Sequence, residues 1–373
     1  MKKRIVLIGP VYPYKTGLSY YVTLLYKQLK LHHEVSIVSY SMQYPWILYR
    51  KPQKDYEDKT LIVGEAEFIL NSANPINWIK TAKHIRKQQP DFIILQWLHP
   101  YFAPCYYTLA KLLHGIDILC ICHNVYPHER FPFDKQLTKL ALRQVDFFIT
   151  HSKSDTNDLK RIVRNKRIKT AVHPAYDFFK LQNMTRSQAR NQMNLRVQDK
   201  VILFFGLVRR YKGLRYLLEA VGLIKDLEDV KLLIAGDFCG NKEEYEKVIE
   251  KNGIQDRVQI TDRHLQTFEV EKYFAACDLV VLPYESATQS GVVQVAYSMN
   301  RPVLATAVGG LPDVVIDMVT GYLVAPRSPK QIADAVVDYY ENNREEQFSN
   351  GIQRMRHKYS WERMEETILD MIG

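Results

Sequence analysis

Short apolar runs alternate with amphipathic segments along almost the whole chain. Residues 4–8 and 116–122 are apolar at nearly every position, whereas the segment 18–31 repeats its apolar residues at helical spacing. Strands that are apolar on both faces are typical of parallel sheets covered by helices on both sides. The pattern therefore predicts βαβ units. The further strands expected in the first half are 34–40, 60–63, 91–96, 146–150 and 169–173.

A second series of strands begins at residue 200, after a polar stretch over 174–199 that we interpret as the connection between domains. The fold class predicted is α/β, with two Rossmann-like, doubly wound parallel sheets facing across a cleft. The domains expected are 1–175 and 176–359, with a last helix at 360–373 that packs back on the first domain. The strands expected in the second series are 200–205, 230–235, 258–260, 278–283 and 302–306.

The charge of the chain is divided unevenly between its halves. Residues 1–180 carry a net charge of +13, residues 181–373 carry −3, and the whole chain carries +10. A cationic half attracts anions, so nucleic acid, anionic lipid and phosphorylated ligands all become candidate partners. Because no helix-turn-helix, RNP or zinc-finger pattern accompanies the charge, we expect no nucleic-acid binding.

Cysteine usage and hydropathy exclude several other classes. Five cysteines at irregular positions form neither a disulfide framework nor a zinc-type double pair. The apolar stretch after Met1 is shorter than a signal peptide needs, and no window is long enough for a membrane-spanning helix. These features predict a cytoplasmic protein.

In the first half, two residues follow predicted strands and are candidates for a site. Gly17 stands at the mouth of the first predicted helix, where a chain without a side chain can approach a ligand closely; a simple turn glycine is the alternative. His123 follows the strand that ends at Cys122, so by topology it faces the carboxyl edge of the sheet. Its alternative is a solvated loop histidine.

In the second half, Gly206, Arg209 and Lys212 follow the first strand in the stretch Phe-Gly-Leu-Val-Arg-Arg-Tyr-Lys-Gly. Cations beside a glycine at the end of a sheet strand suit a diphosphate, because Arg can grip it bidentately and Lys contributes a point charge. The alternative is a solvated cationic face.

A further loop follows the predicted strand 278–283 and leads into a helix that begins near Ser290. The backbone amides of Ser290, Gly291 and Val292 would form an anion site at the start of this helix. Capping of the helix by the Ser290 hydroxyl is the alternative.

The order of these motifs resembles the family 4 retaining glycosyltransferases, also called group 1, which have the GT-B fold. The motifs that carry the resemblance are F-G-x-x-R-x-x-K-G from Phe205, A-G-D from Ala235, A-x-C-D-x-x-x-L-P from Ala275, S-G-V from Ser290, P-V-x-A-T from Pro302, V-G-G-L-P-D from Val308 and T-G-Y-L-V from Thr320.

The resemblance implies that the second domain binds a nucleotide-sugar donor and the first binds the acceptor. Arg209 and Lys212 would hold the donor diphosphate, and His123 would touch the sugar or acceptor. These three are the catalytic candidates. The donor-binding candidates are Gly17, Gly206, Ser290, Gly291, Val292 and Glu285. No metal or other cofactor is expected.

The chain departs from the family at two glutamates that usually flank the phosphate loop. Ala287 and Val295 occupy those positions, as in a variant subgroup of the family. Glu285 is a candidate to replace the first carboxylate, and Gln294 is a weaker candidate for the ribose contact.

The function expected is transfer of a sugar, with retention, to a glycan or a polyprenyl-diphosphate-linked acceptor in cell-surface polysaccharide synthesis. The alternatives are a non-catalytic nucleotide-sugar-binding scaffold and a GT-B nucleotide-sugar epimerase. The cationic half predicts peripheral docking on an anionic inner membrane face. The cations proposed for this docking are Lys135, Lys139, Arg143, Arg161, Arg164, Lys166, Arg167 and Lys169.

Overall fold

The chain divides into two compact units. The computed structural model describes residues 2–50, 52–56, 61–127, 131–224, 227 and 229–373. The first unit comprises Met1–Val172 and Ser360–Gly373, and the second comprises His173–Tyr359. The boundary thus lies a few residues before the predicted one, and the last helix belongs to the first unit.

The first unit contains a parallel sheet in the order β3-β2-β1-β4-β5-β6-β7. The chain starts in the middle, builds one edge and then returns to build the other, so β1 and β4 flank the point where the strand order reverses. Its strands are β1 Arg4–Ile8, β2 Glu34–Met42, β3 Ala66–Asn71, β4 Phe92–Trp97, β5 Asp117–Cys122, β6 Phe147–Thr150 and β7 Arg167–Thr170.

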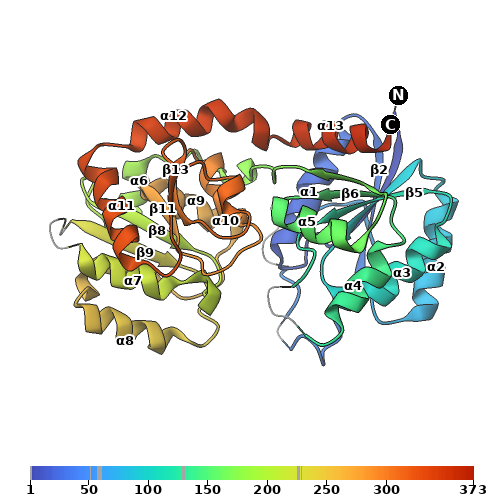
Figure 1. Ribbon diagram of the computed structural model, residues 1–373, viewed down its shortest axis with the longest axis horizontal. Helices are drawn as coiled ribbons and strands as arrows, with labels where there is room; N and C mark the ends of the chain where they lie inside the picture. The colour runs from blue at the N-terminus through green and yellow to red at the C-terminus, as the bar shows by residue number, and fades with distance from the viewer. Residues whose placement is uncertain (1, 51, 57–60, 128–130, 225–226, 228) are drawn as a thin grey trace. The chain divides into compact units, whose positions relative to one another are not determined.

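Helices cover both faces of this sheet. Alternate strand residues pack with α1 and α13 on one face and with α2, α3, α4 and α5 on the other. Figure 1 shows α13, at the C-terminal end of the chain, beside α1 and β6. The helices are α1 Gly17–Lys30, α2 Pro75–Lys87, α3 Ala103–Leu112, α4 Asp134–Leu142, α5 Lys153–Ile162 and α13 Trp361–Ile372.

The second unit repeats this plan in the order β10-β9-β8-β11-β12-β13, with all neighbours parallel. Here β8 and β11 flank the reversal point. Its strands are β8 Lys200–Phe205, β9 Val230–Ala235, β10 Val258–Thr261, β11 Leu279–Leu282, β12 Val303–Thr306 and β13 Gly321–Val324. The predicted class of two Rossmann-like parallel sheets is confirmed.

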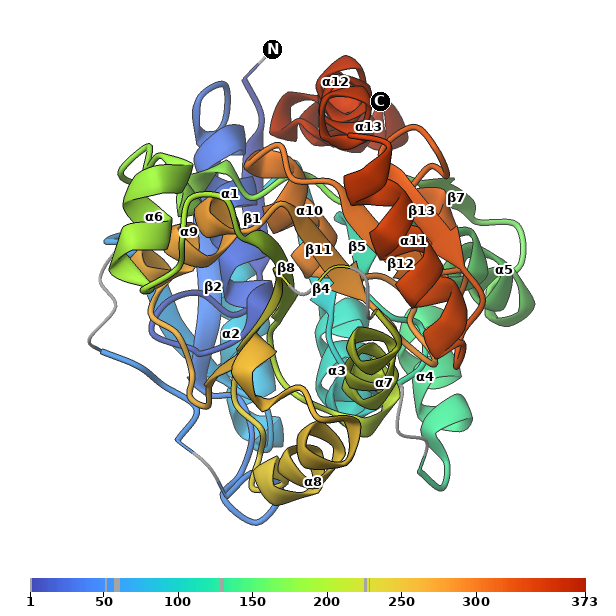
Figure 2. The ribbon, with the colours of Figure 1, turned by 90° about the vertical axis from the view of Figure 1, so that its left-hand side faces the viewer.

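The apolar sides of α7, α8 and α11 cover one face of the second sheet. Figure 2 shows α7 and α11 next to each other on this face. On the other face α9 packs on β8, and α6 packs on α9. The helices are α6 Arg186–Gln192, α7 Leu214–Leu223, α8 Lys242–Asn252, α9 Thr267–Ala276, α10 Gly291–Ser298, α11 Pro329–Glu341 and α12 Glu345–Met355. Short 3-10 turns lie at Pro100–Phe102, Asp177–Phe179, Arg210–Lys212, Gln255–Arg257, Leu311–Asp313 and Arg356–Tyr359.

Two sequence predictions of secondary structure are wrong. Residues 61–63 of the expected strand 60–63 are not a strand, Thr60 lies outside the described residues, and the strand is β3 at Ala66–Asn71. The expected connection over 174–199 contains α6 and lies in the second unit. The segment has the polar composition of a linker, but its Arg190 is buried within the second unit.

Arg190 belongs to a buried ionic network that ties α6 to the sheet. Its guanidinium donates to Asp278 Oδ1 at 2.7 Å and to the Ala276 carbonyl at 3.0 Å. The other Asp278 oxygen, Oδ2, accepts from the amide of Val201 at 2.8 Å and from the hydroxyl of Tyr340 at 3.2 Å. Asp278 thereby joins the start of β8, the start of β11 and two helices.

We expect Asp278→Asn to lower the free energy of unfolding of the second unit by about 3 kcal/mol, because it leaves the buried Arg190 charge uncompensated. Urea denaturation measures this loss. The matched control is Asp229→Asn, which breaks the half-exposed pair with Lys200 (2.9 Å) and should cost less than about 1 kcal/mol. Equal losses in the two variants would contradict the assignment.

Candidate active site

The carboxyl ends of β8 and β11 lie side by side at the reversal point of the second sheet. The strands pair in parallel, with Leu279 opposite Ile202 and Val280 opposite Leu203. The loop after β8 contains Gly206, Arg209 and Lys212, and the loop after β11 leads to Ser290 at the start of α10. Ligands of doubly wound sheets bind at this kind of position.

The structure brings three of the predicted residues together here. A Cβ atom added to Gly206 would lie 3.3 Å from Nζ of Lys212 and 3.8 Å from Cγ2 of Val292. Gly206 also has a φ of +100°, which a residue with a side chain rarely adopts. The Lys212 ammonium therefore lies over bare backbone at the end of β8, next to the first turn of α10.

Tyr284, which is not among the predicted site residues, connects this cation to the start of α10. The Lys212 ammonium lies 5.5 Å from the centre of the Tyr284 ring, at cation–π distance. The Tyr284 hydroxyl lies 3.2 Å from Oγ of Ser290. The available signal was its place directly after Pro283, at the end of a predicted strand.

Two glycines fix the loops around this site. Gly213 has a φ of +67°, and a Cβ there would overlap the carbonyl oxygen of Pro283. Gly309 has a φ of +54°, and a Cβ there would overlap the carbonyl oxygen of Ala287. The loops after β8 and β12 therefore approach the loop after β11 to a distance that only glycine permits.

The first turn of α10 is not capped by its own N-cap side chain. Ser290 is the N-cap residue, but its hydroxyl makes no capping hydrogen bond. Among the described residues, the amides of Gly291 and Val292 donate to no acceptor. Free amides at a helix N-terminus bind anions, whereas the alternative of Ser290 capping does not fit this geometry.

Arg209 is exposed and stands at the entry to the turn Arg210–Lys212. Within the described ranges no carboxylate forms an ion pair with Arg209 or Lys212. Both cations are thus available to an anionic ligand.

The positions of the absent glutamates are buried and apolar. Ala287 is 8% exposed and Val295 is 4% exposed. The carboxylate of Glu285 is engaged elsewhere, since it accepts from the Tyr216 hydroxyl at 3.2 Å and pairs with Arg327 at 2.7 Å. A donor contact by Glu285 would have to compete with these partners. Gln294 is buried, and its Oε1 has no hydrogen-bond partner among the described residues.

In the first unit, Gly17 is the first residue of α1. Thr16 caps this helix by accepting from the amide of Ser19 at 3.1 Å. A Cβ added to Gly17 would meet nothing within 4 Å in the described structure. The fold of this unit therefore does not require a glycine here.

His123 lies directly after β5 in a buried cluster, and the alternative of a solvated histidine is wrong. It is 2% exposed, and its Nε2 lies 2.7 Å from Oε1 of Gln96. Its ring centre is 4.6 Å from that of Tyr21 and 5.4 Å from that of His151. Tyr21 in turn contacts Trp361, with 5.2 Å between ring centres, so the cluster joins α1, α13 and three strand ends.

The sequence also carries a signal for His151, which is not among the predicted site residues. His151 follows β6 as His123 follows β5, and Cys122 pairs with Thr150 in the parallel register. Two histidines that each follow such paired residues must lie next to each other. Burial lowers the pKa of His151 from 6.5 to about 4. The hydrogen bond between its Nδ1 and the Ala171 carbonyl, at 3.0 Å, acts in the opposite direction and is the smaller effect.

Both halves of the chain match family models of known enzymes. Residues 16–175 match Glycosyltransferase Family 4, and residues 199–342 match Glycosyl transferases group 1. This chain belongs to the family 4 glycosyltransferases.

Curated relatives of this chain include proteins named D-inositol 3-phosphate glycosyltransferase. The relative from Mycobacterium marinum is 30% identical over 205 residues, which are 53% of this chain and 43% of the relative. The relative from Corynebacterium diphtheriae is 26% identical over 70% of this chain and 65% of its own length. The chain thus spans less than two thirds of the length of the curated relatives it matches.

Solved structures of similar fold cover the whole family 4 chain at low identity. Sucrose-phosphate synthase from Thermosynechococcus elongatus has a TM-score of 0.76 at 18% identity, covering 99% of this chain and 98% of that one. HepE from Anabaena, solved with UDP, has a TM-score of 0.75 at 16% identity, covering 99% of both chains. These likenesses show the GT-B type of fold.

Six of the eight cations proposed for membrane docking fall into two groups in the first unit. Lys169 and Arg167 contact Asp370 of α13, Lys166 lies 3.5 Å from Asp146, and Arg161 pairs with Asp158. This first group is largely used within the unit. By contrast, Lys135 and Lys139 on α4 are exposed, with no ion pair in the described structure. No helix among the described residues has the length and hydropathy to cross a bilayer.

We expect the first unit to lose stability as the pH falls from 6.5 towards 4. The unfolded chain protonates His151 in this range while the folded chain keeps it neutral, so protons favour unfolding, by up to about 3 kcal/mol at pH 4. His151→Asn retains a donor for Ala171 and removes the titration, so it should flatten the decline. Denaturant midpoints across this pH range measure the difference, with the exposed His114→Asn as control. Parallel curves for wild type and His151→Asn would refute the expectation.

Proposed function

We propose that the protein transfers a sugar from a nucleotide-sugar donor, with retention, and that the donor diphosphate binds at the reversal point of the second sheet. The observation that carries this proposal is the Lys212 ammonium over Gly206, next to the uncapped amides of Gly291 and Val292. A diphosphate presents charged oxygens to both kinds of partner at once. Arg209, which has no carboxylate partner in the described ranges, adds a second cation.

The chemistry proposed needs no nucleophile from the protein. The bond between the anomeric carbon and the diphosphate oxygen breaks, and the acceptor oxygen bonds to the same face of that carbon. The acceptor proton passes to the departing phosphate oxygen. Lys212, Arg209 and the amides of α10 stabilise the charge that grows on the diphosphate, and the rest of the site orients the two reactants.

We propose that this step proceeds without a metal. The groups around the proposed diphosphate are cations and amides, and the two positions where glutamates usually stand are Ala287 and Val295. No group of three metal-binding side chains occurs in the described part of the chain. Cations and helix amides can supply the charge stabilisation that a divalent ion would otherwise give.

For the acceptor we propose a glycan or a polyprenyl-diphosphate-linked glycan bound by the first unit, in cell-surface polysaccharide synthesis at an anionic inner membrane face. The net charge of +13 over residues 1–180 supports an anionic acceptor or surface. His123 is buried against Gln96 and Tyr21. This position supports a role in shaping the carboxyl end of the first sheet, and it supports less a solvent-exposed contact with the acceptor. Solved structures of the same fold bind UDP and UDP-glucose, which supports the donor class.

We expect Lys212→Met to reduce kcat by roughly 100- to 1,000-fold with a sugar nucleotide selected by a calorimetric screen of UDP, GDP, TDP and ADP sugars. The reason is the loss of a cation that acts most strongly on the leaving diphosphate. Arg209→Met should act in the same direction. The matched control is Arg210→Met, which removes an exposed cation from the same turn and should leave turnover within about twofold.

The same variants separate an enzyme from a scaffold. The apolar residues Ala287 and Val295 favour a non-catalytic binding protein as the second candidate. Release of free nucleotide from the donor, dependent on acceptor and on Lys212, indicates a transferase. Binding of a nucleotide sugar without any turnover indicates the scaffold, and no binding at millimolar concentration would refute both.

We expect Gly17→Ala to preserve the stability of the protein, since Ala favours a helix and a Cβ there meets no described atom. Turnover should nevertheless fall by about tenfold or more if the start of α1 approaches a ligand closely. Thermal unfolding and steady-state kinetics measure the two effects, and Ser36→Ala on β2 serves as a conservative control. Unchanged turnover would remove Gly17 from the site.

A further inference from the structure

Between β2 and β3 the first unit presents three large apolar side chains to solvent in succession. Trp46 is 69% exposed, Ile47 is 79% exposed and Leu48 is 59% exposed. Single exposed apolar residues are common on protein surfaces, whereas a contiguous group of this size indicates an interaction site. We call residues 45–49 the apolar tip.

The apolar tip is an ordered turn. The amides of Leu48 and Tyr49 both donate to the carbonyl of Pro45, at 3.0 and 3.1 Å. At the base of the tip, the Gln53 side chain bridges both backbone groups of Tyr44, accepting from its amide at 3.0 Å and donating to its carbonyl at 2.7 Å. The two ends of the segment are thereby held together.

Aromatic packing fixes this base to the core of the unit. The Tyr44 ring lies 5.1 Å from Phe102 and 5.4 Å from Tyr101, measured between ring centres, and burial raises the pKa of its hydroxyl. Tyr49 folds back and stacks on Tyr44 at 6.1 Å. Tyr49 is thus used to hold the turn, while Trp46, Ile47 and Leu48 remain outside it. The contacts of Gln53, Tyr44 and Tyr49 thus hold the turn in a conformation that leaves these three side chains exposed.

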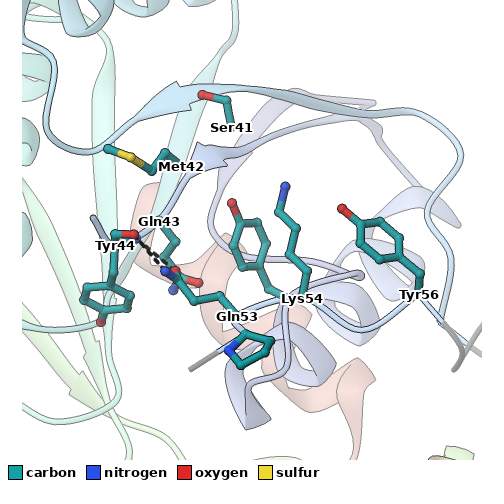
Figure 3. Close-up of a pocket in the computed structure, with 9 residues that line it drawn as sticks. Ser41, Met42, Gln43, Tyr44, Gln53, Lys54 and Tyr56 are labelled. Atoms are coloured by element: carbon teal, nitrogen blue, oxygen red, sulfur yellow. Dashed lines mark hydrogen bonds between the residues drawn. The ribbon is translucent and has the colours of Figure 1, made fainter. Parts of the chain in front are cut away.

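A pocket of about 370 Å³ lies at the base of the apolar tip. Figure 3 shows Lys54 extending between the labelled Ser41 and Tyr56, on the side of the pocket opposite Tyr44. The Lys54 ammonium lies 5.1 Å from the centre of the Tyr14 ring, and no carboxylate of the described residues pairs with it. The residues that line the pocket are Tyr14, Ser41, Met42, Gln43, Tyr44, Pro52, Gln53, Lys54 and Tyr56.

We propose that the apolar tip is a membrane anchor: Trp46, Ile47 and Leu48 enter the interfacial layer of an anionic phospholipid bilayer, and Lys54 binds a lipid phosphate in the pocket behind them. Trp is favoured at the depth of the lipid headgroups, and aliphatic side chains gain free energy by leaving water. The exposed Arg50, which follows the tip, adds a cation at the same surface. This proposal specifies the membrane contact of the proposed function. The contact itself does not require a membrane-linked acceptor; only its biological role rests on the proposed function.

Charge and size favour a bilayer over a protein partner. A stable protein interface needs about 800 Å² on each side, whereas the apolar tip is one turn with three outward side chains. Insertion of a few side chains requires no complementary surface. The net charge of +13 over residues 1–180 complements an anionic lipid surface, which adds to the apolar term.

Vesicle co-sedimentation of the full chain tests the anchor. We expect binding to vesicles of phosphatidylglycerol and phosphatidylcholine, and a roughly tenfold or larger loss of partitioning in the double variant Ile47→Ser, Leu48→Ser. The matched control is Leu31→Ser, which changes a side chain of the same unit that is 70% exposed and outside the tip. Lys54→Gln should weaken binding to anionic vesicles more strongly than it weakens the small affinity for neutral vesicles, because both lipids carry a phosphate and only the anionic one also attracts the lysine by its net charge.

Tryptophan fluorescence gives a second, spectroscopic readout. Trp46 is far more exposed than Trp78 (9%) and Trp97 (0%), so vesicles should shift the emission of the wild type to shorter wavelength and the shift should disappear in Trp46→Phe. Binding that survives the double variant and vanishes in high salt would mean attachment by surface cations such as Lys135 and Lys139, and would overturn the proposal. A shift with protein concentration alone would mean self-association through the tip and would also overturn it.

These measurements do not depend on catalysis. Calorimetric binding of the sugar nucleotide should be equal in the wild type and in the double variant, because the tip and the diphosphate site lie in different units. If vesicle binding through the tip is found while no nucleotide sugar binds, the anchor stands and the proposed transferase fails. If nucleotide binds and turns over but the tip variant partitions like the wild type, the anchor fails and the transferase stands.

Discussion

Parallel pairing of β8 with β11 is the constraint on which the proposed active site depends. Because the chain leaves the sheet at β8, returns to build one edge and then resumes beside β8 at β11, two loops far apart in sequence emerge next to each other. Helices that start from such loops direct free amides at the same region. Gly213 fixes the distance between the loops, because its backbone touches that of Pro283. At the opposite ends of the same two strands, Asp278 directly precedes β11, and its carboxylate accepts from the Val201 amide of β8 and from Arg190. The charges at that end of the strands are thus paired within the fold, whereas Arg209 and Lys212 beyond the other end have no ion-pair partner among the described residues.

The two units use charged and polar residues differently. In the second unit, residues 173–359, acidic and basic side chains are equal in number, and no carboxylate of the described residues forms an ion pair with Arg209 or Lys212 at the proposed diphosphate site. In the first unit, buried polar residues form the cluster of His123, His151 and Gln96 behind the carboxyl edge of the sheet. Arg167 and Lys169 tie β7 to α13, whereas Lys135 and Lys139 are exposed on α4. The surplus charge of the first unit is therefore mainly a property of its surface, which agrees with a role in attracting an anionic acceptor or membrane.

The first unit also has exposed apolar residues, which form the apolar tip. Gln53 and Tyr44 hold the apolar tip in place. Its exposed apolar side chains contribute little to the stability of the fold, because they stay in water. Together with Lys54 it would give the unit both an apolar and an electrostatic contact to one surface. Such a combination resists salt better than charge alone, because burial of apolar surface is not screened.

By itself, the sequence determined the class of fold and singled out one loop with a glycine and cations as a candidate, because two-sided apolar strands and a glycine-cation motif are local patterns. It also predicted that the loop with Gly206 and Lys212 shares an edge with the start of the helix at Val292, since the carboxyl ends of parallel strands meet there, and in the structure these three residues lie close together. Local patterns failed where a residue's meaning depends on a distant partner. Residues 174–199 look like a linker until Asp278 buries Arg190, and Arg167 and Lys169 look like a free cationic patch until Asp370 pairs with them. The apolar run at 46–48 could equally have been a buried strand. Only the tertiary structure decided these cases, because burial and charge compensation are properties of contacts between segments far apart in the chain.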